Sequence, residues 1–227
     1  MSWLEAFIIG LLQALTEFLP VSSSGHIELA KVIQDIQNAD DASFSVVVHV
    51  ATALSTIVVF RKDIWQLIKC LFVGNDWDSR KFILYIIISM IPVGIVGVFF
   101  KDQVESLFTG NLILVGSMLL VTACLLMITR FIQEGDRKLN IVLAAIIGIA
   151  QAIAVLPGIS RSGATIATAL ILGVPREQAA RFSFLMVIPP ILGAGALEAK
   201  DLASGEVEAL GATPLIVGFL ASFFFGI

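Results

Sequence analysis

The chain has 227 residues, of which 58% are hydrophobic and 14% charged, with a net charge of −4 and a mean hydropathy of +0.98. Soluble domains carry about 25% charged residues, so this composition excludes a water-soluble fold and requires lipid to solvate part of the chain. The acidic balance and the lack of a basic stripe exclude nucleic acid as a partner. Cys70 and Cys124 stand far apart in different settings, so they predict neither a disulfide nor a metal pair.

Long apolar stretches predict membrane-spanning helices, which need about 20 residues to cross a bilayer. In chain order they occupy Phe44–Phe60, Phe82–Phe100, Leu112–Ile128, Leu139–Leu156, Phe182–Leu197 and the segment from Pro214 to the end. Two other segments, Val21–Gln37 and Ile159–Val174, are shorter, follow prolines and begin with serine, glycine and an ionisable residue. Short segments that are polar at one end fit half-crossing helices, so we predict two re-entrant hairpins.

Lysine and arginine residues in the connections predict the orientation, because cytoplasmic loops are enriched in them. The expected loop from Arg61 to Lys81 holds five basic residues and the one over 130–138 holds three, whereas residues 101–110 contain only Lys101. This places the first hairpin at the outer face and the second at the cytoplasmic face.

An internal repeat at a constant offset of 138 positions organises the chain. Eight residues recur without a gap: Gly10, Gln13, Ala14, Ser22, Ser24, Gly25, Phe44 and Ser45 return as Gly148, Gln151, Ala152, Ser160, Ser162, Gly163, Phe182 and Ser183. We therefore expect an all-α integral membrane fold, a single domain over 1–227, with copies at about 1–131 and 139–227. Each copy would hold one hairpin and three crossings, an odd number, which predicts an inverted-topology repeat. The offset also predicts that the second copy is truncated at residue 227.

The first hairpin contains ionisable and nucleophilic side chains in an apolar setting. Glu17 lies one helical turn after Gln13, and a carboxylate deep in an apolar helix marks a functional site by default. A position near the water interface is the alternative for Glu17. After Pro20, the run Ser22, Ser23, Ser24 and Gly25 supplies an N-cap and free backbone N–H groups at the start of the next helix. His26 follows Ser23 by three residues, so both can face the same side.

The second hairpin repeats this plan with an arginine. Arg161 takes the repeat position of Ser23, and its planar, permanently charged guanidinium suits a phosphate. Gly158 and Gly163 allow close backbone approach, and Ser160 and Ser162 flank the arginine. An interfacial arginine that reaches lipid headgroups is the bland alternative. Two helix N-termini together with Arg161 predict a phosphate site, and a nucleophile with a proton carrier makes hydrolysis plausible.

The segments Gln13–His26, Pro157–Gly163 and Ala180–Leu185 closely resemble motifs of the undecaprenyl-diphosphate phosphatase family, also known as bacitracin-resistance proteins. The resemblance covers essentially the whole chain. It implies hydrolysis of undecaprenyl diphosphate to the monophosphate, recycling of this carrier for wall polymers, bacitracin resistance, a divalent cation, and a bacterial plasma membrane site open to the periplasm. Two positions depart from the family pattern: Gln13 weakens a two-carboxylate metal site, and His49 stands where glutamine is expected.

The resulting hypothesis has a catalytic set of Glu17, Ser23, His26 and Arg161. Either Ser23 attacks the terminal phosphorus, with His26 as its base, or His26 attacks directly; both remain open. The other expected phosphate ligands are Ser22, Ser24, Gly25, Gly158, Ser160, Ser162 and Gly163. Mg²⁺ or Ca²⁺ is expected on Glu17, with Gln13 as a second ligand.

The expected partners are a polyprenyl diphosphate and membrane lipid, and a homodimer remains open. A lipid-phosphate flippase is the main alternative, since inverted repeats are typical of transporters. It could also be a second activity of the same protein. An ion channel ranks lower, because Arg161 and Glu17 do not line an obvious pore.

Overall fold

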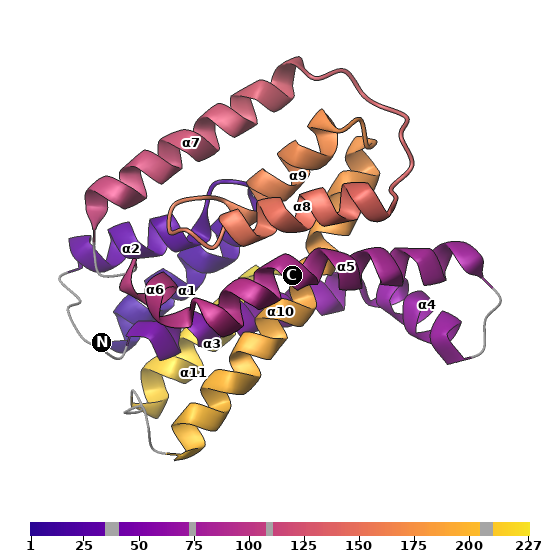
Figure 1. Cartoon of the computed structure of the whole chain (residues 1–227). Coiled ribbons are helices and arrows are strands. Elements are labelled where there is room, and N and C mark those ends of the chain that lie inside the picture. Colours follow the sequence, from indigo (N-terminus) through magenta and orange to yellow (C-terminus); the bar gives the residue numbers. More distant parts are fainter. Residues whose placement is uncertain (35–40, 73–75, 108–110, 205–210) are drawn as a thin grey trace.

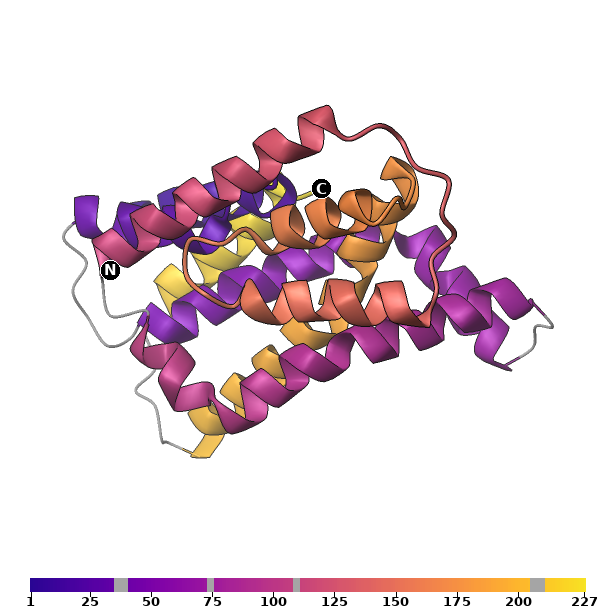
Figure 2. The ribbon, with the colours of Figure 1, turned by 45° about the horizontal axis from the view of Figure 1, so that its top comes forward.

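The computed structural model describes residues 1–34, 41–72, 76–107, 111–204 and 211–227, and within these residues every regular element is a helix. Helix α7 lies along one side of the molecule, next to α2 and α9, and the C-terminal part of α10 and the start of α11 lie on the opposite side (Figures 1 and 2). The helices are α1 Trp3–Phe18, α2 Ser23–Ile33, α3 Asp41–Val59, α4 Arg61–Phe72, α5 Trp77–Phe99, α6 Lys101–Ser106, α7 Leu112–Phe131, α8 Ile141–Ile153, α9 Arg161–Ile171, α10 Arg176–Ser204 and α11 Ala212–Phe225.

Three helices are long and apolar enough to cross a membrane, in agreement with the spans predicted over Phe82–Phe100, Leu112–Ile128 and Phe182–Leu197. They are α5, α7 and the Arg176–Leu197 part of α10. A fourth candidate is formed by α3 and α4 together, which bend by 78° at their junction. Large apolar side chains cover the outside of these helices, with Val98 and Ile113 74% and 84% exposed. Such surfaces are stable in lipid, so the chain is an integral membrane protein.

The segment Arg61–Lys81, predicted as a charged loop, is largely helical. Its first half forms α4, an amphipathic helix that buries Leu67 and Cys70 and leaves Trp65 and Phe72 exposed. The side chain of Asp63 accepts a hydrogen bond from Nε of Arg181 in α10 at 2.7 Å, which ties α4 to the bundle. The prediction failed because the charges of this segment hide an apolar stripe of helical period.

The predicted span Leu139–Leu156 is also shorter than expected. Helix α8 ends at Ile153, and turns follow, in which the amides of Val155 and Leu156 bond to the carbonyls of Ala152 and Ile153. Helix α11 lies in the predicted C-terminal span and is 14 residues long.

Helices α2 and α9 occupy the two predicted polar segments and have 11 residues each. At 1.5 Å per residue each rises about 16 Å, roughly half the thickness of a bilayer's hydrocarbon core. The predicted end of the first segment, Gln37, lies outside the described residues.

Glycines allow two helix pairs to approach closely. A Cβ on Gly10 of α1 would lie 2.6 Å from the carbonyl oxygen of Gly218 in α11, and one on Gly148 of α8 would lie 2.5 Å from that of Ser89 in α5. The hydroxyl of Ser222 in α11 also donates to the carbonyl of Gly10 at 3.0 Å. Small residues and interhelical hydrogen bonds are the usual means of holding helices together in lipid. These contacts fix α1 and α8, whose C-terminal ends lead to the two polar turns.

Candidate active site

The first polar turn follows α1 and places three serines at the start of α2. Ser22 caps α2, since its Oγ accepts a hydrogen bond from the amide of Gly25 at 3.3 Å. Its φ of 70° is the only positive value among the described non-glycine residues. A serine in this conformation is strained, and strain of this kind concentrates at functional sites. The turn brings the hydroxyl of Ser23 to Glu17, near the end of α1.

The second polar turn repeats this construction at the start of α9. Ser160 caps the helix by accepting from the amide of Gly163 at 3.0 Å. The turn is fixed from outside by Thr122 of α7, whose Oγ1 donates to the carbonyl of Gly158 at 3.0 Å and accepts from the amide of Ser160 at 2.9 Å. Gly158 has a φ of +97°, which side chains rarely adopt. Thr122 carries no motif and was not predicted as part of the site.

The two turns pack directly on each other. A Cβ on Gly25 would lie 3.0 Å from the Cα of Gly158, and one on Gly163 would lie 3.1 Å from the carbonyl oxygen of Pro20. These glycines therefore bring the two helix N-termini together, whereas the sequence predicted that Gly158 and Gly163 let the backbone approach a ligand. Each N-terminus carries partial positive charge, so their union favours an anion between them.

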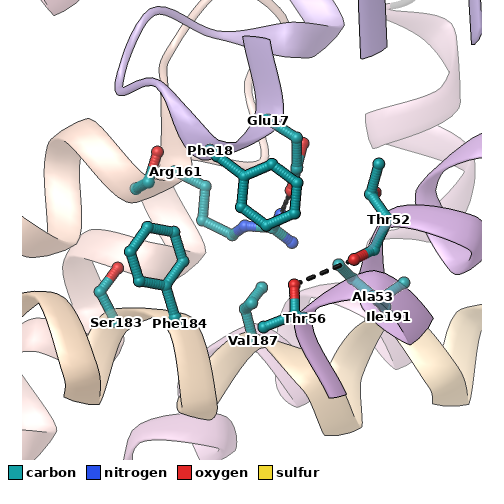
Figure 3. Close-up of a pocket in the computed structure, with 11 residues that line it drawn as sticks. Glu17, Phe18, Thr52, Ala53, Thr56, Arg161, Ser183, Phe184, Val187 and Ile191 are labelled. Carbon is teal, nitrogen blue, oxygen red and sulfur yellow. Dashed lines mark hydrogen bonds and ion pairs between the residues drawn. The ribbon is translucent and has the colours of Figure 1, made fainter. Parts of the chain in front are cut away.

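A carboxylate and a guanidinium meet at this junction. Arg161, at the start of α9, donates through Nη2 to Oε1 of Glu17, and the Glu17 side chain is only 11% exposed. Oε2 of the same carboxylate accepts from the hydroxyl of Ser23 at 2.5 Å and from Nε2 of Gln13 at 3.2 Å. Figure 3 shows Arg161 reaching toward Glu17 past Phe18. Buried charges need such partners, and here they join three of the four residues predicted to be catalytic.

The two histidines make the same kind of backbone contact, but only His49 has Nε2 close to Glu17. Nδ1 of His26 is 2.8 Å from the carbonyl of Ser22, and Nδ1 of His49 is 2.7 Å from that of Ser45. A carbonyl oxygen only accepts, so in each ring Nδ1 carries the proton and Nε2 is left for other partners. Nε2 of His49 lies 3.8 Å from Oε2 of Glu17. His26 has no hydrogen bond to Ser23 among the described residues, and Ser23 donates to Glu17 instead.

A cavity of about 640 Å³ opens beside this cluster. Both capped helix starts contribute to its wall, through Ser22–Ser24 and Ser160–Ser162. Polar side chains without a predicted role also line it, among them His49 of α3, the ion pair of Glu28 and Lys31 in α2, at 3.2 Å, and Gln151 of α8. Apolar residues complete the wall, among them Ile27, Val46, Val93, Val104, Val187 and Ile191. A polar end with apolar walls fits a ligand that has an anionic group and an apolar chain.

A second void, of about 10 Å³, lies on another side of the Glu17–Arg161 pair. Figure 3 shows Thr52 and Thr56 of α3 and Ser183 of α10 around it. Its volume equals that of about one water molecule, and hydroxyls in its wall give such a water the partners it needs.

The predicted phosphate ligands separate into two groups. Ser22, Ser23, Ser24, Ser160, Arg161 and Ser162 line the large cavity. Gly25, Gly158 and Gly163 pack the turns together behind it, and His26 is not among the lining residues. Sequence reasoning gave no role to His49, although its departure from the family pattern was a signal. The sequence identified Gln151 only as the repeat equivalent of Gln13.

The site around Glu17 offers few protein oxygen ligands to a divalent cation. The described residues contain no group of three or more His, Cys, Asp or Glu side chains suited to a metal. Oε1 of Gln13 is buried without a hydrogen-bond partner, and the other end of this amide contacts Glu17. One carboxylate and one amide oxygen fit a cation that takes its remaining ligands from water and substrate phosphate, the usual arrangement for Mg²⁺.

Comparison with known proteins agrees with the motifs. A protein of Bacteroides thetaiotaomicron named undecaprenyl-diphosphatase is 52% identical over 229 residues, which cover 100% of this chain and 87% of that protein. Proteins with the same name from Christiangramia forsetii and Korarchaeum cryptofilum are 50% and 42% identical, covering 98% of this chain and 85% and 86% of their own lengths. The family described as "Bacitracin resistance protein BacA" matches residues 6–227. The resemblance seen in the sequence is thus confirmed, and this chain belongs to the bacitracin resistance protein family.

Proposed function

We propose that this protein hydrolyses undecaprenyl diphosphate to undecaprenyl phosphate and inorganic phosphate. One observation carries the proposal: the hydroxyl of Ser23 donates to Glu17 at 2.5 Å beside Arg161, where two helix N-termini line one cavity. The names of the relatives state the same activity. Recycling of the lipid carrier for wall polymers, and resistance to bacitracin, follow from it. The names support hydrolysis and give no support to the flippase alternative.

In the proposed first step, Oγ of Ser23 attacks the terminal phosphorus and its proton passes to Oε2 of Glu17. The bond between that phosphorus and the bridging oxygen breaks, and its electron pair leaves with the prenyl monophosphate. Water then attacks the phosphorus of the phosphoserine, the bond from phosphorus to Oγ breaks, and Glu17 returns its proton to Oγ of Ser23, while the protons of the water leave with inorganic phosphate. Ser23 is preferred over His26 as nucleophile because its hydroxyl already bonds to a proton acceptor and lines the cavity.

Arg161 and the helix starts supply the positive charge. In the free protein Arg161 is paired with Glu17, so an incoming phosphate must compete for the guanidinium. When the guanidinium moves from the carboxylate to the phosphate, Oε1 of Glu17 is released, while Oε2 keeps its hydrogen bond from Ser23. The first amides of α2 and α9, with the hydroxyls of Ser24 and Ser162, then donate to the equatorial oxygens. Glu17 and Gln13 would hold Mg²⁺ or Ca²⁺, which neutralises phosphate charge when bound.

The inverted repeat belongs to the same proposal, with α2 and α9 as half-crossing helices. An offset of 138 relates α1 to α8, α2 to α9, α3 to α10 and α5 to α11. Helix α1 packs on α11, and their equivalents α8 and α5 pack on each other. The caps correspond as well, since Ser22 and Ser160 bond to equivalent glycines. This pattern supports two interlocked copies, with the site between them.

We also propose that the cavity opens to the outer, periplasmic face of the bacterial plasma membrane. Val104 of α6 lines the cavity and lies in the connection 101–110, which carries one basic residue. The strongly basic connections would lie in the cytoplasm. Apolar residues of the cavity wall would hold the start of the prenyl chain. A homodimer stays a prediction, which the mass of the detergent-solubilised protein checks.

The test is phosphate release from a C55 prenyl diphosphate in detergent, where transport is impossible. We expect release by the wild type and a loss of about 10³-fold or more in Arg161→Ala, as for other residues that stabilise phosphoryl transition states. Arg130→Ala, at the far end of α7, serves as a control that should keep activity. Wild-type protein that releases no phosphate with Mg²⁺ or Ca²⁺ present would refute the proposed function.

A further inference from the structure

Gln151 is the one buried side chain of the large cavity whose polar atoms are wholly unpaired among the described residues. It is 1% exposed, lies near the end of α8, and lines the cavity together with Ala154 and Ile159. Neither Nε2 nor Oε1 has a hydrogen-bond partner. A buried amide without partners costs free energy, and lipid offers no compensation. A leucine would satisfy the packing at no such cost, so the amide is expected to serve a ligand.

The equivalent glutamine in the first copy shows the contrast. Gln13 uses Nε2 twice, toward Oε2 of Glu17 at 3.2 Å and toward Oγ1 of Thr52 at 3.1 Å. It therefore supports the catalytic carboxylate from within the protein. Gln151 has no such structural partner, and its side chain faces the space where substrate would lie.

The chemistry of the cavity indicates which group Gln151 would meet. Ser23, Arg161 and the two helix starts surround the terminal phosphate in the proposed reaction. A diphosphate has a second phosphate, attached to the prenyl chain, which also loses its hydration when the substrate enters the cavity. This prenyl-side phosphate is fully ionised at neutral pH and has only acceptor oxygens, and an amide N–H₂ is a neutral donor that matches them. Gln151 lies on the wall built by α8 and the turn before Arg161, next to the apolar residues that suit the chain.

We propose that Nε2 of Gln151 donates to an oxygen of the prenyl-side phosphate and thereby stabilises the leaving group. This inference rests on the proposed function of the same site. When the bridging P–O bond breaks, the electron pair moves onto the leaving phosphate, so a hydrogen bond to it strengthens in the transition state. Gln151 is then a catalytic residue that acts mainly on kcat, and it also binds the monophosphate product.

The substitution Gln151→Leu tests this with three measurements on the detergent-purified full chain. Phosphate release should fall by about ten- to a hundredfold, the worth of one hydrogen bond to a charged group, chiefly through kcat. The melting temperature without ligand should stay equal or rise, because an unpaired amide has been removed. Farnesyl phosphate should raise the melting temperature of wild type, and in the variant this increase should be smaller or absent. Gln151→Glu, which keeps the shape but adds a negative charge, should be at least as inactive as the leucine variant.

The matched control is Ser89→Ala in α5, a buried polar residue that contacts α8 at Gly148 but does not line the cavity. It should retain activity and the response to farnesyl phosphate. Activity within twofold of wild type in Gln151→Leu would overturn the inference, as would a drop in its melting temperature of several degrees. Failure of the proposed function looks different: wild type would then release no phosphate, whether or not farnesyl phosphate stabilises it through Gln151.

Discussion

Gly25 and Gly158, which lie 133 positions apart in the chain, touch: a Cβ on Gly25 would lie 3.0 Å from the Cα of Gly158. This contact joins the turn that carries Ser23 to the turn that carries Arg161. Since neither residue has a side chain, the two helix starts approach more closely than any other pair of residues would allow. The proposed anion site therefore depends on backbone contact as much as on charged side chains.

Gly158→Ala should damage both folding and activity. Its φ of +97° disfavours a side chain, and the new Cβ would lie 2.5 Å from the carbonyl oxygen of Val115. We expect a destabilisation of about 1–3 kcal/mol and a loss of most phosphatase activity, measured by thermal melting and phosphate release. Gly116→Ala is the control, because its Cβ would meet nothing within 4 Å and alanine favours a helix. Equal behaviour of the two variants would contradict the role given to the glycine contact.

Thr122→Val should loosen the turn before Arg161. The substitution removes the hydroxyl that donates to Gly158 and accepts from Ser160, and it leaves two buried backbone groups unpaired. We expect about 1–3 kcal/mol less stability and a fall in kcat, as Arg161 loses its fixed position. Thr129→Val, in the same helix, removes only a bond to the carbonyl of Leu126 and should be near neutral. An active, stable Thr122→Val protein would show that the turn does not need the hydrogen bonds of Thr122.

The choice of nucleophile is open to a trapping experiment. With Ser23 as nucleophile, acid quenching during turnover should leave phosphate on the peptide that contains Ser23, detected by mass spectrometry. Ser23→Ala should then lose about 10³-fold or more in phosphate release, whereas Ser24→Ala should lose far less. Phosphate found on His26 after an alkaline quench, which preserves the acid-labile phosphohistidine, or an active Ser23→Ala variant, would instead favour direct attack by the histidine.

Removal of divalent cations should lower activity if the cation is held by Glu17, Gln13 and the substrate. Chelation should abolish phosphate release, and added Mg²⁺ or Ca²⁺ should restore it. Gln13→Glu adds a second carboxylate next to Glu17, so the half-maximal Mg²⁺ concentration should fall. Activity that persists unchanged in excess chelator would remove the cation from the proposal.

The sequence predicted the membrane class, the three long spans and both polar turns, because hydropathy and the serine–glycine–proline pattern are local properties. It missed the helix Arg61–Phe72, where an apolar stripe is interrupted by five charged or amide side chains. It also overestimated Leu139–Leu156, since an apolar composition does not reveal where the chain turns after Ile153. The repeat-related glutamines look alike in sequence, yet among the described residues only Gln13 has hydrogen-bond partners.

The sequence alone therefore determined which residues are candidates to act on a phosphate: the motifs contain two candidate nucleophiles, Ser23 and His26, together with the cationic Arg161 and the helix caps. Only the tertiary structure decided how they combine. It joined Ser23 to Glu17 rather than to His26, placed His49 against the same carboxylate, and brought Gln151 to the cavity wall. The reason is physical: capping and hydropathy act over a few residues, whereas these contacts arise where helices distant in the chain pack together.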